Sequence, residues 1–151
     1  MIRLVIFDFS GTLGDYNPAG PRRVFERLKE FNLPVSEEKT AGRLAEVLPD
    51  CLLLARNWQE FADRIIQKLG IVLESDRREA LAAFLGKRPV HKLFGDAGEA
   101  TKLPQGKAIL TLSPKFAIAD IYELRHFEIF SPDVTGAAKP DPAAFLAVLG
   151  K

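Results

Sequence analysis

Three short polar segments of this 151-residue sequence each follow an apolar run that is typical of a buried strand. Asp8 and the segment Ser10-Gly11-Thr12 follow the first run, Ser113 follows the second, and Lys139 lies beyond the third. A carboxylate, hydroxyl groups and an ammonium group brought together can displace a group from an anionic substrate. The carboxylate attacks, the hydroxyls and loop amides bind oxygens, and the lysine neutralises charge.

The elements that must position these side chains are predicted to be parallel strands. The run 2–7 is almost unbroken and ends abruptly at Asp8, as a strand covered on both faces does, and 107–112 and 127–130 are also predicted to be strands. Parallel strands bring their carboxyl ends to one edge of the sheet, where open α/β folds place their ligands. The segment 9–14 is therefore predicted to be a tight loop at that edge.

The segment 15–90 has the periodicity of helices, and we predict a helical insert there. Its clearest helix is predicted between Asn57, as an N-cap with Glu60 three residues later, and Gly70, as a C-terminal stop. The periodic apolar positions, including Cys51, are interpreted as core. The predicted domains are an α/β core of residues 1–14 and 91–151, and a helical domain of residues 15–90.

The second half of the core is predicted to alternate helices with the strands. A short helix is expected near 96–102, and a longer one from Pro114 to about Arg125 with Ser113 as its cap. The alternative to a functional role is that Ser113 serves only as the cap of this helix. The segment 133–138 is predicted to be a loop, and Asp141 is predicted to cap a last helix.

These polar segments, taken in their order along the chain, resemble three motifs of the haloacid dehalogenase-like hydrolase superfamily. The resemblance covers essentially the whole chain and rests on Asp8-Phe9-Ser10-Gly11-Thr12-Leu13, Leu110-Thr111-Leu112-Ser113 and Gly136-Ala137-Ala138-Lys139-Pro140-Asp141. It implies a Rossmann-like core with a helical cap domain inserted after strand one.

The resemblance also implies roles for individual residues. Asp8 would be the nucleophile that forms an aspartyl intermediate, and Thr12 would orient it. Ser113 would bind the transferred group together with Ser10 and Gly11, and Lys139 would balance the charge. Mg²⁺ would be held by the Asp8 carboxylate and the Ser10 carbonyl.

Two departures from the family pattern change these expectations. Ser10 stands where the phosphatases of the family have a second Asp, and a serine hydroxyl cannot act as their general acid and base. An acidic fourth motif is not found after Lys139, so that one carboxylate would give only a weak Mg²⁺ site. Strand one would then lack a neighbour on one side, and we expect a homodimer through that edge.

The leading functional hypothesis is a phosphatase that acts on a small phosphate ester. The alternatives are a 2-haloacid dehalogenase and a degenerate member that binds a ligand or a partner without catalysis. With 21 basic and 20 acidic residues, a net charge of +1 and no basic run, the sequence predicts no nucleic-acid or membrane partner. The single cysteine and the absence of a signal peptide favour the cytoplasm.

Overall fold

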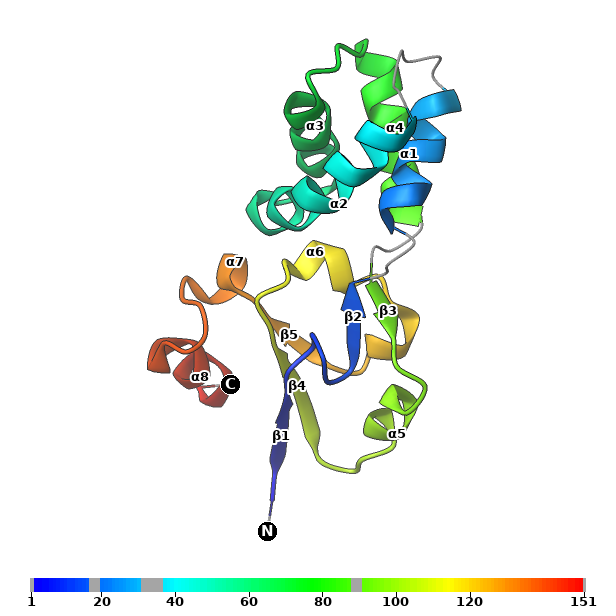
Figure 1. Cartoon of the computed structure of the whole chain (residues 1–151). Helices are drawn as coiled ribbons and strands as arrows, with labels where there is room; N and C mark the ends of the chain where they lie inside the picture. Colours follow the sequence, from blue (N-terminus) through cyan, green and yellow to red (C-terminus); the bar gives the residue numbers. More distant parts are fainter. Residues whose placement is uncertain (1, 17–19, 31–36, 88–90, 151) are drawn as a thin grey trace. The chain divides into compact units, whose positions relative to one another are not determined.

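A computed structural model of the chain describes residues 2–16, 20–30, 37–87 and 91–150 (Figure 1). The chain divides into two compact units, one of Met1–Tyr16 with His91–Lys151 and one of Asn17–Val90. The boundary predicted after residue 14 falls within a short strand, Gly14–Tyr16, which belongs to the first unit.

The first unit is an α/β domain built on a parallel sheet. In chain order it contains β1 (Leu4–Phe7), β2 (Gly14–Tyr16), β3 (His91–Leu93), α5 (Ala97–Thr101), β4 (Gly106–Leu110), α6 (Lys115–Ile118), the 3₁₀ turn η1 (Tyr122–Leu124), β5 (Glu128–Phe130), α7 (Pro132–Thr135) and α8 (Pro142–Leu149). The strand order is β1-β4-β5, and both pairings are parallel. The predicted α/β fold class is therefore confirmed.

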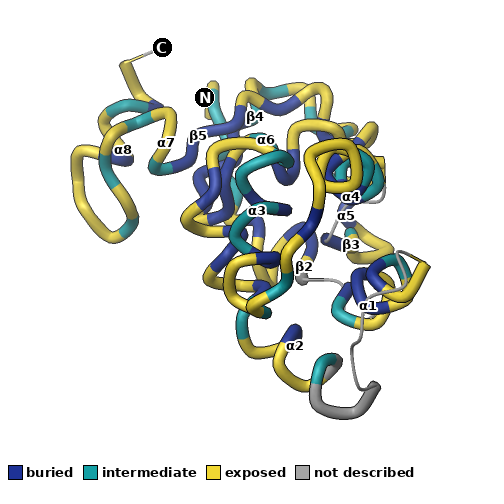
Figure 2. The backbone as a smooth tube through the Cα atoms, turned by 90° about the horizontal axis from the view of Figure 1, so that it is seen from above, coloured by how far each residue is buried: buried dark blue, intermediate teal, exposed yellow. Residues whose placement is uncertain are grey.

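The strands of this sheet are apolar because helices cover both of its faces. Along β4, Ile109 packs into one buried cluster, while Ala108 and Leu110 pack into another. The first cluster includes residues from α5 and η1, the second includes residues from α8, and Figure 1 shows α5 and α8 on opposite sides of the sheet. Figure 2 shows the inner parts of β4 and β5 as buried.

A two-stranded antiparallel ribbon of β2 and β3 accompanies the sheet and was not predicted from the sequence. Tyr16 pairs with His91, and Gly14 pairs with Leu93. A Cβ atom at Gly14 would lie 2.7 Å from the backbone oxygen of Lys92, so that only glycine allows this close approach of the two strands. The ribbon holds together the two places where the first unit connects to the second.

Among the described strands, β1 pairs only with β4 and forms one edge of the sheet. The residues of β1 are partly exposed. An apolar edge of this kind can pair with a strand of another chain, for example in a dimer. The homodimer expected through this edge stays a prediction.

Among its described residues, the second unit contains the helices α1 (Gly20–Glu30), α2 (Glu37–Leu54), α3 (Trp58–Leu69) and α4 (Ser75–Lys87). Their predicted apolar stripes form its core; the fully or almost fully buried members include Val24, Phe25, Leu28, Leu44, Leu48, Cys51, Phe61, Ile65, Leu81 and Leu85. Burial raises the pKa of the Cys51 thiol, as expected for a cysteine in a core. Within the described residues, no helix is long and apolar enough to cross a membrane.

Both predicted ends of α3 are confirmed. The Asn57 side chain accepts a hydrogen bond from the Glu60 amide at 2.8 Å, and Gly70 ends the helix in the left-handed conformation with a φ of 67°. The Glu60 carboxylate accepts hydrogen bonds from the Arg56 backbone amide and from the Arg56 and Arg64 guanidinium groups. These bonds lower the pKa of Glu60 to about 2.

Replacing Asn57 by Ala removes the side-chain acceptor that caps α3. We expect Asn57→Ala to lower the free energy of unfolding by about 1 kcal/mol, because the Glu60 amide loses its partner. Gln67→Ala is the matched control, since Gln67 is exposed on the same helix, and it should change stability by less than about 0.5 kcal/mol. Urea unfolding followed by circular dichroism measures both, and equal stabilities of the two variants would contradict the prediction.

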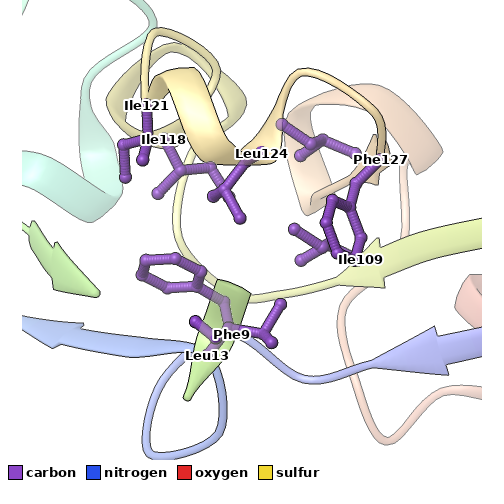
Figure 3. Packing of buried hydrophobic residues seen from close by; sticks show 9 residues of the cluster. Phe9, Leu13, Ile109, Ile118, Ile121, Leu124 and Phe127 are labelled. Carbon is purple, nitrogen blue, oxygen red and sulfur yellow. The ribbon is translucent and has the colours of Figure 1, made fainter. Parts of the chain in front are cut away.

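The long helix predicted from Pro114 to about Arg125 is wrong. The structure has α6 and η1 instead, separated by Ala119, Asp120 and Ile121. Ile118, Ile121 and Leu124 all enter the core beside the sheet, and their spacing of three residues matches a 3₁₀ turn better than an α-helix (Figure 3). The predicted cap is also wrong, because Pro114 occupies the N-cap position and Ser113 lies before it.

Candidate active site

Asp8 lies directly after β1, at the carboxyl end of the parallel sheet. Its Oδ1 accepts hydrogen bonds from the Phe9 amide at 2.7 Å and from the Lys139 ammonium at 2.5 Å. Among the described residues, no group donates a hydrogen bond to Oδ2, and the side chain is 47% exposed. The carboxylate is thus held by one oxygen, while the other remains accessible for attack.

The loop after Asp8 is organised around one carbonyl group. The amides of Thr12, Leu13 and Gly14 all donate to the Phe9 oxygen at 2.9 to 3.1 Å, and Gly11 has a φ of 77° that favours glycine. The Phe9 side chain anchors the loop, because it is fully buried in the core beside the sheet (Figure 3). The position of Asp8 therefore follows from a buried neighbour and a tight turn.

The other predicted residues of this loop lie on its exposed side. Ser10 and Thr12 are exposed, and the Gly11 amide already donates to the Gly14 carbonyl at 2.9 Å. In the described part of the chain, the Thr12 side chain makes no hydrogen bond to Asp8. The Phe9 amide holds Asp8 instead, and the orienting role of Thr12 stays a prediction.

Lys139 reaches Asp8 from a position 131 residues away in the sequence. Two helix ends fix its loop: Gly136 closes α7 in the left-handed conformation, and the Asp141 side chain caps α8 by accepting from the Ala143 amide. The Thr135 hydroxyl adds a hydrogen bond to the Ala137 carbonyl at 2.6 Å. The segment 133–138, predicted to be a loop, thus contains the last turn of α7.

Ser113 follows β4, the neighbour of β1, and is buried. Its amide donates to the Thr111 hydroxyl at 3.0 Å, and its own hydroxyl lies 3.4 Å from Nε2 of His91. Because its side chain caps no helix, the structural alternative for Ser113 does not apply. The residue remains a candidate for binding a substrate oxygen.

His91 is a residue of this site that the sequence analysis missed. It lies in β3, is only 7% exposed, and packs edge-to-face against Phe9 with ring centroids 5.1 Å apart. Burial lowers the pKa of its imidazole to about 4, although the backbone of Ala117 and the negative charge of Asp15 oppose the shift. No motif contains this histidine, and its contacts depend on a strand pairing between distant segments.

The described residues do not by themselves fit a Mg²⁺ site. No cluster of three or more Asp, Glu, His or Cys side chains suited to a metal ion occurs among them. Asp8 supplies one carboxylate, and one of its oxygens is engaged by Lys139. Mg²⁺ prefers an octahedron of oxygen ligands, so that a single carboxylate and the Ser10 carbonyl are a poor set.

No family model and no curated protein matches the sequence. Solved structures do match the fold along 99% of the chain. An L-2-haloacid dehalogenase from Xanthobacter autotrophicus with covalently bound chloropropionic acid is 18% identical, with a TM-score of 0.57. The chain covers 64% of that enzyme, and thus spans less than two thirds of its length.

Two further similar structures carry different descriptions. A predicted phosphoglycolate phosphatase from Haemophilus somnus is 18% identical, with a TM-score of 0.52 over 71% of its length. A predicted hydrolase of the haloacid dehalogenase-like family from Porphyromonas gingivalis is 15% identical, with a TM-score of 0.53 over 76% of its length. Together with the parallel sheet and the segment 17–90 placed after its first strand, these likenesses show that the chain has the haloacid dehalogenase-like fold.

Proposed function

We propose that this chain is a hydrolase that uses Asp8 as its nucleophile, with a small phosphate monoester as substrate. The observation that carries the proposal is the contact between Asp8 and Lys139, which occurs at the carboxyl end of β1. A half-exposed carboxylate with one free oxygen can attack, and a neighbouring ammonium group lowers the repulsion between that carboxylate and an anionic substrate. Ser113, at the end of the adjacent strand, supports the proposal as a ligand for a substrate oxygen.

The proposed reaction has two steps. In the first, Asp8 Oδ2 attacks phosphorus, the bond from phosphorus to the ester oxygen breaks, and the leaving alkoxide takes a proton from water. In the second, water attacks the phosphorus of the aspartyl phosphate, releases inorganic phosphate and a proton, and restores the carboxylate. Ser10 offers no carboxylate to assist either proton transfer, so we expect the second step to be slow and the intermediate to accumulate.

A second candidate is the hydrolytic dehalogenation of a 2-haloacid. It is favoured by a site with one carboxylate and one lysine but, among the described residues, no metal-binding cluster. Asp8 would attack the carbon that carries the halogen, the bond to the halogen would break, and halide would leave. Water would then attack the carboxyl carbon of the Asp8 ester and release the hydroxy acid. One of the similar structures is an L-2-haloacid dehalogenase with covalently bound chloropropionic acid.

Turnover of two substrate classes tests the proposal. A panel of aryl and alkyl phosphates and a panel of 2-chloro acids should each be incubated with and without Mg²⁺, and phosphate and halide release should be measured. Phosphate release supports the leading proposal, and metal-independent halide release supports the second candidate. Absence of both, from a protein with a native circular dichroism spectrum, would refute the proposed hydrolase and favour a non-catalytic binding role.

The missing second carboxylate leads to a prediction for Ser10. Ser10→Asp should raise the steady-state rate of aryl phosphate hydrolysis by at least about tenfold, because a carboxylate there can deprotonate the attacking water. Ser10→Asn is the matched control, since it has nearly the same shape and no titratable group. A phosphatase rate in Ser10→Asp no higher than that of Ser10→Asn, with both variants folded, would contradict Ser10 as the limiting feature.

A further inference from the structure

The His91 side chain contacts two separate segments of the candidate active site. Its Nε2 lies 3.4 Å from the Ser113 hydroxyl, and its ring meets the Phe9 ring at an interplanar angle of 83°. One buried imidazole therefore links the loop after β1 to the loop after β4.

These contacts restrict the groups that would meet the substrate. A serine hydroxyl rotates freely unless a neighbour fixes it, and a buried neutral imidazole next to it fixes that rotation. The contact of the His91 ring with Phe9 affects Asp8 in the same way, because the Phe9 amide donates a hydrogen bond to Asp8 Oδ1 at 2.7 Å. The same ring thus braces the backbone that carries Asp8 and the hydroxyl of Ser113.

We propose that His91 is a positioning residue, which holds the Ser113 hydroxyl in the orientation that the displacement at Asp8 requires. The proposal rests on the hydrolase activity proposed above. His91 itself does not touch the substrate and transfers no proton. Its effect passes through Ser113, so its removal should slow the chemical step more than it weakens substrate binding.

The first test is the kinetic effect of substitutions at His91. With p-nitrophenyl phosphate as the substrate, or with a 2-chloro acid if only halide is released, His91→Leu should lower kcat about tenfold while KM changes by less than about twofold. His91→Gln keeps a polar group at a similar reach, and should recover kcat to within about threefold of the unmodified chain. His126→Leu makes the same change at an exposed histidine, and should leave both constants unaltered.

A double-mutant cycle separates positioning from a general loss of structure. If His91 acts through Ser113, then His91→Leu should cost less than about twofold in kcat when Ser113 is already Ala. An undiminished tenfold loss in that background would overturn the proposal. So would a His91→Gln variant that is folded yet as slow as His91→Leu.

The same cycle measured by urea unfolding distinguishes this proposal from the proposed function. If the unmodified chain has no turnover, the hydrolase proposal fails, and the link between His91 and Ser113 is then judged by unfolding midpoints alone. A smaller midpoint shift for His91→Leu in the Ser113→Ala background supports the link. Additive shifts overturn it.

Discussion

Asp8→Asn is expected to abolish turnover of whichever substrate the chain accepts, with a loss of at least about 10³-fold. The amide of asparagine is nearly isosteric with the carboxylate and can still accept the Phe9 amide hydrogen bond, but it is a far weaker nucleophile. Acid-quenched reactions of the unmodified chain should contain an adduct on the peptide that carries Asp8, detected by mass spectrometry. The Asp8→Asn variant should contain none.

The control for this substitution is Asp96→Asn. Asp96 is an exposed aspartate that precedes α5 and makes no capping hydrogen bond with its side chain, so its conversion should leave the rate within about twofold. Both variants should be purified identically, so that a contaminating hydrolase would appear equally in each. Turnover that persists in Asp8→Asn, or an adduct on another residue, would show that a different group is the nucleophile.

Lys139→Gln should lower kcat about 10²-fold or more. The substitution keeps most of the side-chain length and removes the positive charge that lies 2.5 Å from Asp8 Oδ1. That charge is proposed to offset the negative charge of nucleophile and substrate, and groups aimed at such charge commonly contribute 10² to 10³ in rate. The free energy of unfolding should change by no more than about 1 kcal/mol, because a partly exposed ion pair contributes little to stability.

The chain offers a matched ion pair as the control. Lys102 and Glu99 are 2.6 Å apart on the exposed surface at α5, where the pair is solvated on both sides. Lys102→Gln makes the same chemical change there and should alter kcat by less than about twofold. A similar rate for Lys139→Gln and Lys102→Gln would mean that the contact of Lys139 with Asp8 has only a structural role.

The fold of the sheet and the approach of Lys139 to Asp8 could be predicted because both follow from strong local patterns. The apolar runs that became β1, β4 and β5 end at polar residues, and parallel pairing then brings those ends to one edge. The two ends of α3 were predictable for a similar reason, since Asn57 and Gly70 act within a few residues of their own positions.

The features that could not be predicted depend on contacts between distant segments. β2 and β3 have three residues each, too few to show an alternating pattern, and their pairing joins Tyr16 to His91. His91 enters the site only through that pairing. The break between α6 and η1 arises where core packing of Ile121 overrides a local preference for helix. In each case tertiary contacts decide what the local sequence leaves open.

The ribbon of β2 and β3 brings together the two ends of the segment Asn17–Val90. Tyr16 and His91 are directly paired, so the chain leaves and re-enters the first unit about 5 Å apart. Topologically, this helical segment occupies the place of the tip of a β-hairpin, which usually has two to five residues. Closing so long a connection costs conformational entropy. Because its helices form a core of their own, their packing offsets that cost, and the pairing of β2 with β3 does not have to. A hairpin tip of this kind accepts domain insertion, so a helical segment of a different size can replace this one while the strand order stays the same.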